Sequence, residues 1–103
     1  PEDELNRVAK GQEGANYGFP YCHANGIADP DIKIPNACAG VVMPAALTGP
    51  HTAGLGILFY TGEMFPKGYQ NTAFIARRGS WNKAQKTGYD VVLARTTPDG
   101  KAK

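Results

Sequence analysis

Three short apolar segments lie between Gly54 and Thr96, and they constrain the fold more than any other feature of the sequence. Residues 57–60, 72–77 and 89–95 are rich in β-branched and aromatic side chains, and each is bounded by turn-forming residues. The connections between them are too short to hold crossover helices. We therefore predict three antiparallel strands that follow one another as a meander.

The last of these segments is apolar on both faces. Strand alternation places Val91 and Leu93 on one face and Val92 and Ala94 on the other. Both faces must be covered, yet a chain of 103 residues forms one domain at most and has little left to cover them. Two all-β folds fit this pattern. One is a β-propeller blade that lacks its outer strand and is buried by its neighbours, and the other is a small free-standing β domain.

The first half of the chain predicts an irregular region. Between residues 23 and 50, glycine, proline, asparagine and aspartate recur every few positions, and compact domains keep such loops for function or for a covalent link. Cys22 and Cys38 would provide that link as a disulfide, which favours an oxidising compartment. The alternatives are free thiols, or a zinc site that would need both cysteines together with His23 and His51.

Charge is divided unevenly along the chain. Residues 1–50 carry three basic and six acidic side chains, whereas residues 51–103 carry eight basic and three acidic ones. The second half therefore favours an anionic ligand, although a solvated basic surface explains the same count. The basic residues are not interleaved with aromatics as in nucleic-acid-binding surfaces. No apolar stretch reaches the roughly 18 residues of a membrane span, so we expect neither kind of partner.

The first residues of the chain contain no Met, no basic stretch and no apolar stretch. No targeting peptide is visible in them, and we expect a processing or truncation point at this end.

Several short motifs occur in a distinctive order. They are DELN at 3–6, NYGFP at 16–20, GPHTA at 49–53, FYTG at 59–62, FP at 65–66 and GSWN at 79–82. In this order and spacing the chain resembles the soluble quinoprotein glucose/sorbosone dehydrogenases, also called aldose sugar dehydrogenases, and above all their L-sorbosone dehydrogenase-like branch. The resemblance spans nearly the whole chain. It implies a six-bladed β-propeller that binds pyrroloquinoline quinone (PQQ) and calcium and works in the periplasm or as a secreted protein.

The resemblance also implies that this chain is one part of a longer enzyme. The family oxidises the C1 hydroxyl of aldoses, or an aldehyde in the sorbosone case, with a histidine base on an earlier blade. Neither His23 nor His51 matches that base, so we expect no catalytic residue in this C-terminal-side segment. We expect residues 1–53 to form a blade connection and loop region, and residues 54–103 the three-stranded core of a blade. Its partners would be the remaining blades or a dimer mate, and the electron acceptor is not indicated.

Two residues correspond to a structural calcium site of the family. Glu4 would supply a carboxylate and Tyr17 a main-chain carbonyl. Calcium takes six to eight oxygen ligands, so these two can be only part of such a site. For Glu4 the alternative is an ordinary solvated carboxylate.

Four residues map near the PQQ pocket of the family. An arginine fork suits the carboxylates of PQQ, and an indole ring packs against planar rings. The family often has lysine near residue 78, and the sorbosone branch often has histidine there. For each of the four, a structural or surface role is the alternative. These predicted cofactor residues are His51, Thr52, Arg78 and Trp81.

Overall fold

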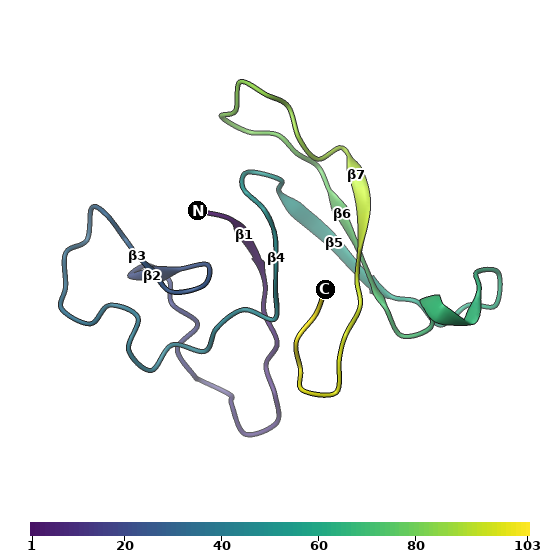
Figure 1. Cartoon of the computed structure of the whole chain (residues 1–103), viewed down its shortest axis with the longest axis horizontal. Coiled ribbons are helices and arrows are strands. Elements are labelled where there is room, and N and C mark those ends of the chain that lie inside the picture. Colours follow the sequence, from purple (N-terminus) through teal and green to yellow (C-terminus); the bar gives the residue numbers. More distant parts are fainter.

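The computed structural model describes residues 1–103 as an all-β chain with three separate antiparallel sheets (Figure 1). This confirms the predicted fold class. No helix in the structure has the length and apolar content that crossing a membrane requires. The elements are β1 (Asp3–Leu5), β2 (Cys22–His23), β3 (Ile27–Ala28), β4 (Ala46–Gly49), β5 (Gly54–Phe59), the 3₁₀ turn η1 (Lys67–Tyr69), β6 (Ala73–Arg77) and β7 (Asp90–Ala94).

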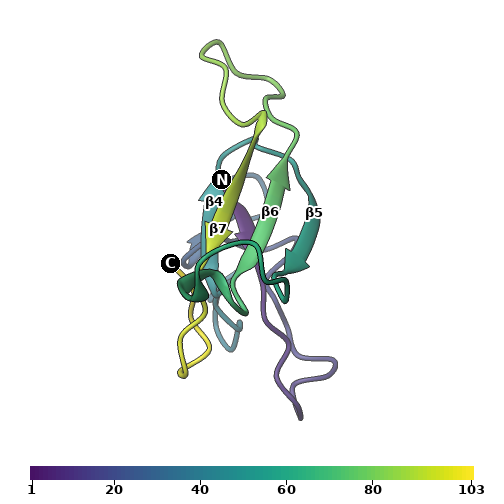
Figure 2. The same ribbon diagram turned by 90° about the vertical axis from the view of Figure 1, so that its right-hand side faces the viewer.

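The largest sheet is the predicted meander, with β6 between β5 and β7 (Figure 2). In its register Phe74 of the central strand lies opposite Leu58 on one side and Leu93 on the other. Strands β6 and β7 fall inside the predicted segments, but β5 begins earlier than expected. Its first residues include Gly54 and Gly56, and glycine carries no strand signal. This sheet is consistent with one blade of a β-propeller, and we call it the blade sheet.

One face of the blade sheet holds the hydrophobic core. Ala73, Ile75 and Ala94 are buried there, because β1 and the last residues of the chain lie over that face and bring Leu5 and Ala102 against it. The core is small, because only ten of the 103 residues are buried.

The edge strand β5 is uncovered. All six of its residues are exposed, and the exposed fractions reach 75% for Leu55 and 68% for Leu58. Ile57 and Phe59 pair with the core residues Ile75 and Ala73 and lie on the core face, yet they too are more than half exposed, whereas Leu58 lies on the opposite face. This chain covers only part of one face of the sheet, which confirms the expectation that it has little left to cover both faces.

The molecule is flat and has a large surface for its mass. Its extents are 50 × 40 × 17 Å and its radius of gyration is 15.3 Å, against about 12.8 Å for a compact domain of this length. Its accessible surface is 7275 Å², whereas a compact monomer of 11.0 kDa exposes about 5,600 Å². The chain therefore exposes roughly 1,600 Å² that a self-sufficient domain would bury.

The first half of the chain contains two small strand pairs within long loops. β1 pairs with β4, and β2 pairs with β3 across a tight turn. Neither β1 nor β4 was among the strands predicted from the sequence. Cys22 and Cys38 form a disulfide with their Cα atoms 5.1 Å apart, and no free cysteine remains. The disulfide prediction is confirmed, and a zinc site built from the two thiolates is excluded.

The last residues of the chain return along the end of β7. Arg95 and Lys103 exchange two backbone hydrogen bonds of 2.8 and 3.1 Å, and Thr96 bridges to Ala102. The amide of Ala102 also donates to the carbonyl of Ala45 at 2.9 Å. This hairpin therefore ties the blade sheet to the segment that leads into β4.

Candidate cofactor site

The two loops that were predicted to face PQQ lie against each other at one end of the blade sheet. The turn 51–53 leads into β5, and the connection 78–89 leaves β6 at the same end, because Gly54 pairs with Arg77 (Figure 1). Three consecutive carbonyls of the turn accept amides of the connection. They are His51 from Trp81 at 3.4 Å, Thr52 from Gly79, and Ala53 from Arg78 at 2.9 Å.

The turn 51–53 is strained and is held from its other side by one carboxylate. His51 and Ala53 both have left-handed backbone angles, with φ of 57° and 49°, which cost energy for residues with a side chain. Oδ2 of Asp3 accepts the amides of Thr52 and Ala53, each at 2.8 Å, and lies 3.0 Å from the Thr52 hydroxyl. Asp3 was not singled out by the sequence, although it is the first residue of the DELN motif.

Thr52 is the centre of this arrangement. Its exposed fraction is 2%, and its hydroxyl lies within hydrogen-bond distance of Asp3 and of the carbonyls of Thr48 and Gly49. The hydroxyl is therefore satisfied inside the protein. A direct contact of Thr52 with a cofactor stays a prediction.

The two neighbouring arginines 77 and 78 differ in what they contact. Arg77 points onto the sheet, where its Nε and Nη2 donate to the two carboxylate oxygens of Asp90 and its Nη1 donates to the Thr48 carbonyl at 2.8 Å. The hydrogen bond from Arg77 lowers the pKa of Asp90, and the same bond raises the pKa of Arg77. Arg78 is exposed, and its guanidinium makes no hydrogen bond or ion pair with the chain. It is therefore free to bind a ligand.

Aromatic and hydroxyl groups lie next to Arg78. The rings of His51 and Trp81 have centroids 6.2 Å apart at an angle of 45°, and Trp81 is 68% exposed. The hydroxyl of Ser80 is buried and has no hydrogen-bond partner. An unpaired buried hydroxyl is unfavourable, and a polar ligand at this end of the sheet would offer it a partner.

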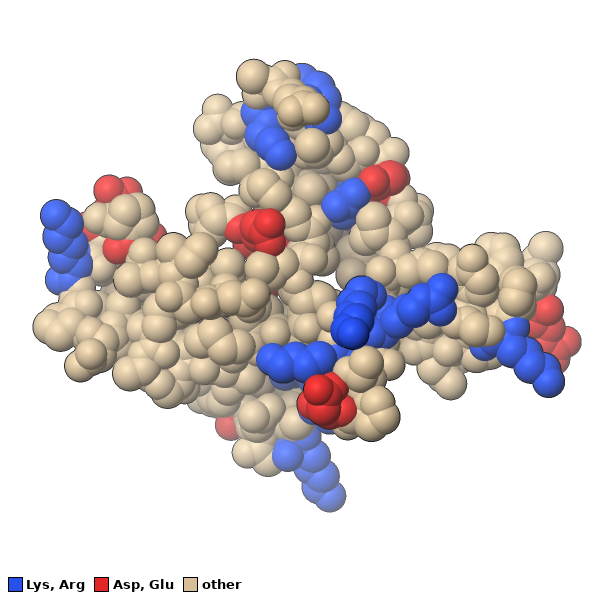
Figure 3. Space-filling view, in the orientation of Figure 1, with Lys and Arg blue, Asp and Glu red and all other residues tan.

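The connection 78–89 is basic. It contains Arg78, Lys83 and Lys86 and no acidic side chain. Figure 3 shows basic side chains on the lobe at the top of the molecule, above the blade sheet. An anionic ligand is therefore favoured here over a cationic one.

Comparison with known proteins assigns the chain to a family. The sequence model described as Glucose / Sorbosone dehydrogenase matches residues 1–80. The chain belongs to the glucose/sorbosone dehydrogenase family. It is also 36% identical over 92 residues to an uncharacterized protein of Borreliella burgdorferi, an alignment that covers 88% of this chain and 24% of that relative. No solved structure matches the chain.

Membership of the glucose/sorbosone dehydrogenase family confirms the predicted resemblance at the level of the family. The family generally depends on PQQ, and the matched residues include His51, Thr52 and Arg78 but end one residue before Trp81. The sorbosone-like branch stays a prediction. The chain spans about a quarter of the length of the Borreliella relative, so most of a protein of that length lies outside it.

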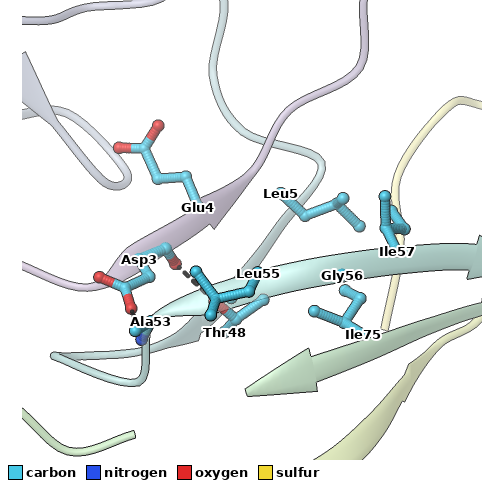
Figure 4. Close-up of a pocket in the computed structure, with 10 residues that line it drawn as sticks. Asp3, Glu4, Leu5, Thr48, Ala53, Leu55, Gly56, Ile57 and Ile75 are labelled. Atoms are coloured by element: carbon cyan, nitrogen blue, oxygen red, sulfur yellow. Dashed lines mark hydrogen bonds between the residues drawn. The ribbon is translucent and has the colours of Figure 1, made fainter. Parts of the chain in front are cut away.

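The two predicted calcium ligands do not form a metal site by themselves. Oε1 of Glu4 accepts the amide of Ala24 and Oε2 accepts the side-chain amide of Asn6. Figure 4 shows the Glu4 carboxylate turned away from the groove that separates β1 from β5, whereas Asp3 points to Ala53. No group of three or more His, Cys, Asp or Glu side chains is placed to hold a metal ion. Glu4 and the carbonyl of Tyr17 therefore stay predictions.

The remaining histidine, His23, is engaged elsewhere. Its Nε2 lies 2.7 Å from Oδ2 of Asp29, next to the disulfide. This hydrogen bond lowers the pKa of Asp29, with smaller contributions from the amides of Asp31 and Ile32. His23 thus braces the loop, and nothing places it near the loops 51–53 and 78–89.

Proposed function

We propose that this chain forms part of the PQQ pocket of a periplasmic or secreted enzyme that oxidises aldoses or sorbosone-type sugar aldehydes. The observation that carries the proposal is the joining of the turn 51–53 to the connection 78–89, beside an arginine that has no partner in the chain. The family to which the chain belongs supplies the type of cofactor.

The residues at this end of the sheet fit the chemistry of PQQ. The cofactor is planar and carries three carboxylates, and the guanidinium of Arg78 would bind one of them through charge-assisted hydrogen bonds. The exposed indole of Trp81 and the ring of His51 would pack against its plane. The Ser80 hydroxyl would gain the partner that it lacks. When bound, PQQ accepts the two electrons that leave the sugar.

The proposal gives this chain a binding role and no catalytic base. His23 is paired with Asp29, and His51 does not correspond to the base of the family. The base and the rest of the pocket would come from other blades. The 103-residue chain alone, mixed with PQQ, calcium, an aldose and an electron-accepting dye, should therefore show no turnover. Measurable oxidation of the sugar would contradict this division of roles.

Calcium enters the proposal only in part. Glu4 and the carbonyl of Tyr17 are two oxygens of the six to eight that the ion takes. The residues of this chain do not fit a complete site, and no step of the reaction is assigned to the ion.

The uncovered surface supports a place between neighbouring blades. A standard interface buries about 800 Å² on each partner, so an excess of roughly 1,600 Å² corresponds to about two such faces. A blade in a propeller has a neighbour on each side. We therefore propose that further blades of the same protein cover β5 and the open face of the blade sheet. The disulfide supports the proposed location outside the cytoplasm.

A small free-standing binding module is the second candidate, and the exposure of β5 disfavours it. Such a module would have to hide this edge strand by dimerisation. Light scattering on the 103-residue chain separates the two. A stable monomer with a dispersed NMR spectrum would support the free-standing module, and aggregation or a molten chain would support the blade.

The cofactor proposal is tested by titrating PQQ into the cofactor-free, full-length protein that contains this chain. Arg78→Ala should weaken binding by about tenfold to a hundredfold, because a hydrogen bond to a charged group contributes about 1.5–3 kcal/mol. Arg78→Lys should lose less, since it keeps the charge but not the fork.

Lys67→Ala is the matched control for this titration. Lys67 is an exposed cation in η1, at the opposite end of the blade sheet, so its loss should leave PQQ binding unchanged. If Arg78→Ala binds PQQ as tightly as the unaltered protein, the proposed site is wrong.

A further inference from the structure

We propose that Asp3 is a positioning residue that sets the shape of the pocket by holding the turn 51–53 against the connection 78–89. The inference rests on the proposed function, because the pocket is the one proposed for PQQ. Asp3 makes no hydrogen bond to the connection, and Thr52 is the one predicted cofactor residue to which it is hydrogen-bonded. Its influence would pass through the backbone of the turn.

The turn 51–53 is held from two sides. Its amides and its carbonyls point in different directions and have different partners. Two amides, those of Thr52 and Ala53, donate to one oxygen of Asp3. The three carbonyls, from residue 51 to residue 53, accept amides of the connection. The turn therefore lies between the carboxylate of Asp3 on one side and the connection 78–89 on the other.

The backbone of the turn is strained. Left-handed backbone angles at His51 and Ala53 make this conformation unfavourable for the turn alone. A residue in such a conformation persists only when its surroundings impose it. The paired amides have no other acceptor in the structure, so the carboxylate of Asp3 is the group that imposes the conformation from the side of β1.

Asp3 is itself anchored in the structure. It begins β1, which pairs with β4, and its own carbonyl accepts the hydroxyl of Thr48 at 3.2 Å. In Figure 4 its carboxylate is directed at Ala53, at the end of the groove between β1 and β5. The residue is thus fixed at both its backbone and its side chain. Through Asp3, the position of the first half of the chain determines the position of the loop that carries Arg78 and Trp81.

The test compares amide hydrogen exchange by mass spectrometry in the cofactor-free, full-length protein and its variants. Asp3→Ala should speed exchange by about tenfold or more in peptides covering residues 49–56 and 76–83, because hydrogen bonds to a charged acceptor are lost. Peptides that cover β7 should be unaffected. Asp3→Asn should preserve most of the protection, since its amide oxygen can accept the same two bonds. Asp31→Ala removes an exposed carboxylate in a distant loop and should change neither peptide.

A PQQ titration of the same variants completes the test. Asp3→Ala should weaken PQQ binding by about tenfold, and Asp3→Asn should lie close to the unaltered protein. The inference is wrong if exchange over residues 76–83 does not change in Asp3→Ala. It is also wrong if exchange rises throughout the chain in both Asp3 variants, which would indicate general unfolding.

Failure of the inference can be told from failure of the proposed function. If Arg78→Ala weakens PQQ binding and Asp3→Ala loosens both peptides without weakening it, Asp3 does not shape the pocket. If the protein binds no PQQ although exchange changes as expected, the proposed function fails and the holding of the loop by Asp3 stands.

Discussion

Gly79 and Gly88 lie so close together that neither position has room for a side chain. A Cβ atom on Gly79 would be 2.8 Å from the Cα of Gly88 and would clash with the carbonyl oxygen of Thr87, and one on Gly88 would be 2.5 Å from the Cα of Gly79. Both residues also have left-handed backbone angles. The two ends of the connection 78–89 are therefore closed by direct backbone contact, and the basic residues between them project as one loop.

Gly79→Ala should open this loop. The clash with the backbone and the left-handed angle together should cost about 2–5 kcal/mol of stability. Chemical denaturation would measure the loss. Gly40→Ala is the matched control, because Gly40 also has a left-handed angle but nothing lies within 4 Å of the added atom. It should cost only about 1–2 kcal/mol. Equal losses in the two variants would show that the close approach of Gly79 to Gly88 does not exist in solution.

Reduction of the Cys22–Cys38 disulfide should destabilise the first half of the chain. A link that closes a loop of about 15 residues contributes roughly 3 kcal/mol in the chain-entropy model. Thermal unfolding with and without a reducing agent measures the effect. The Cys22→Ala, Cys38→Ala double variant should show the lower stability under both conditions. If reductant shifts the double variant as much as the unaltered protein, the shift does not come from this bond.

The ion pair of Arg77 and Asp90 should make stability depend on pH in the acid range. Because Arg77 lowers the pKa of Asp90, the folded chain binds that proton less readily than the unfolded chain. The stabilisation is therefore complete above the ordinary aspartate pKa of about 3.9. It is lost as the pH falls through the lower folded-state value. The stability difference between the unaltered protein and Asp90→Asn should shrink over that window, as urea denaturation at a series of pH values would show.

An Arg77→Gln background supplies the control for the pH experiment. With the partner removed, Asp90→Asn should change stability by a nearly constant amount over the same pH range, since the two residues then no longer interact. A pH-dependent difference that survives in this background would assign the effect to another group.

Leu58→Lys should affect stability far more in the full-length protein than in the 103-residue chain. In the 103-residue chain Leu58 is largely exposed, so the change should alter stability by less than about 0.5 kcal/mol. In the full-length protein a neighbouring blade should cover it, and the same change should cost about 2–3 kcal/mol or more. Met64→Lys, in the exposed loop after β5, should be mild in both. A small effect of Leu58→Lys in the full-length protein would contradict a covered β5.

The blade sheet could be predicted from the sequence because β6 and β7 each have a recognisable strand pattern. Residues 73–77 and 90–94 are apolar, β-prone and bounded by turns, so local preference and the final fold agree. β4 was missed, since its Ala, Leu, Thr and Gly have no common preference and it is a strand only because β1 lies beside it. The disulfide was expected from the two cysteines and the loop between them, and the structure decided for it against the free thiols and the zinc site that the sequence left open.

The sequence indicated the two loops of the candidate site but not how they are held together. The motifs GPHTA and GSWN indicated two loops, and the structure places them together. The role of Asp3 could not be derived, because it depends on a contact across 49 positions of sequence. The sequence also could not distinguish the different roles of Arg77 and Arg78. Adjacent residues on a strand point to opposite sides, and only the position of Asp90 decides which arginine is paired.

The fastening of the loops through main-chain atoms has a consequence for how such sites can diverge. The attachment at residue 78 uses its amide and not its guanidinium, so any side chain other than proline keeps the loop in place. Arginine here, and the histidine or lysine implied for other members, can thus be exchanged without rebuilding the scaffold. The side chain of the proposed cofactor contact can therefore change while the fold that presents it stays constant.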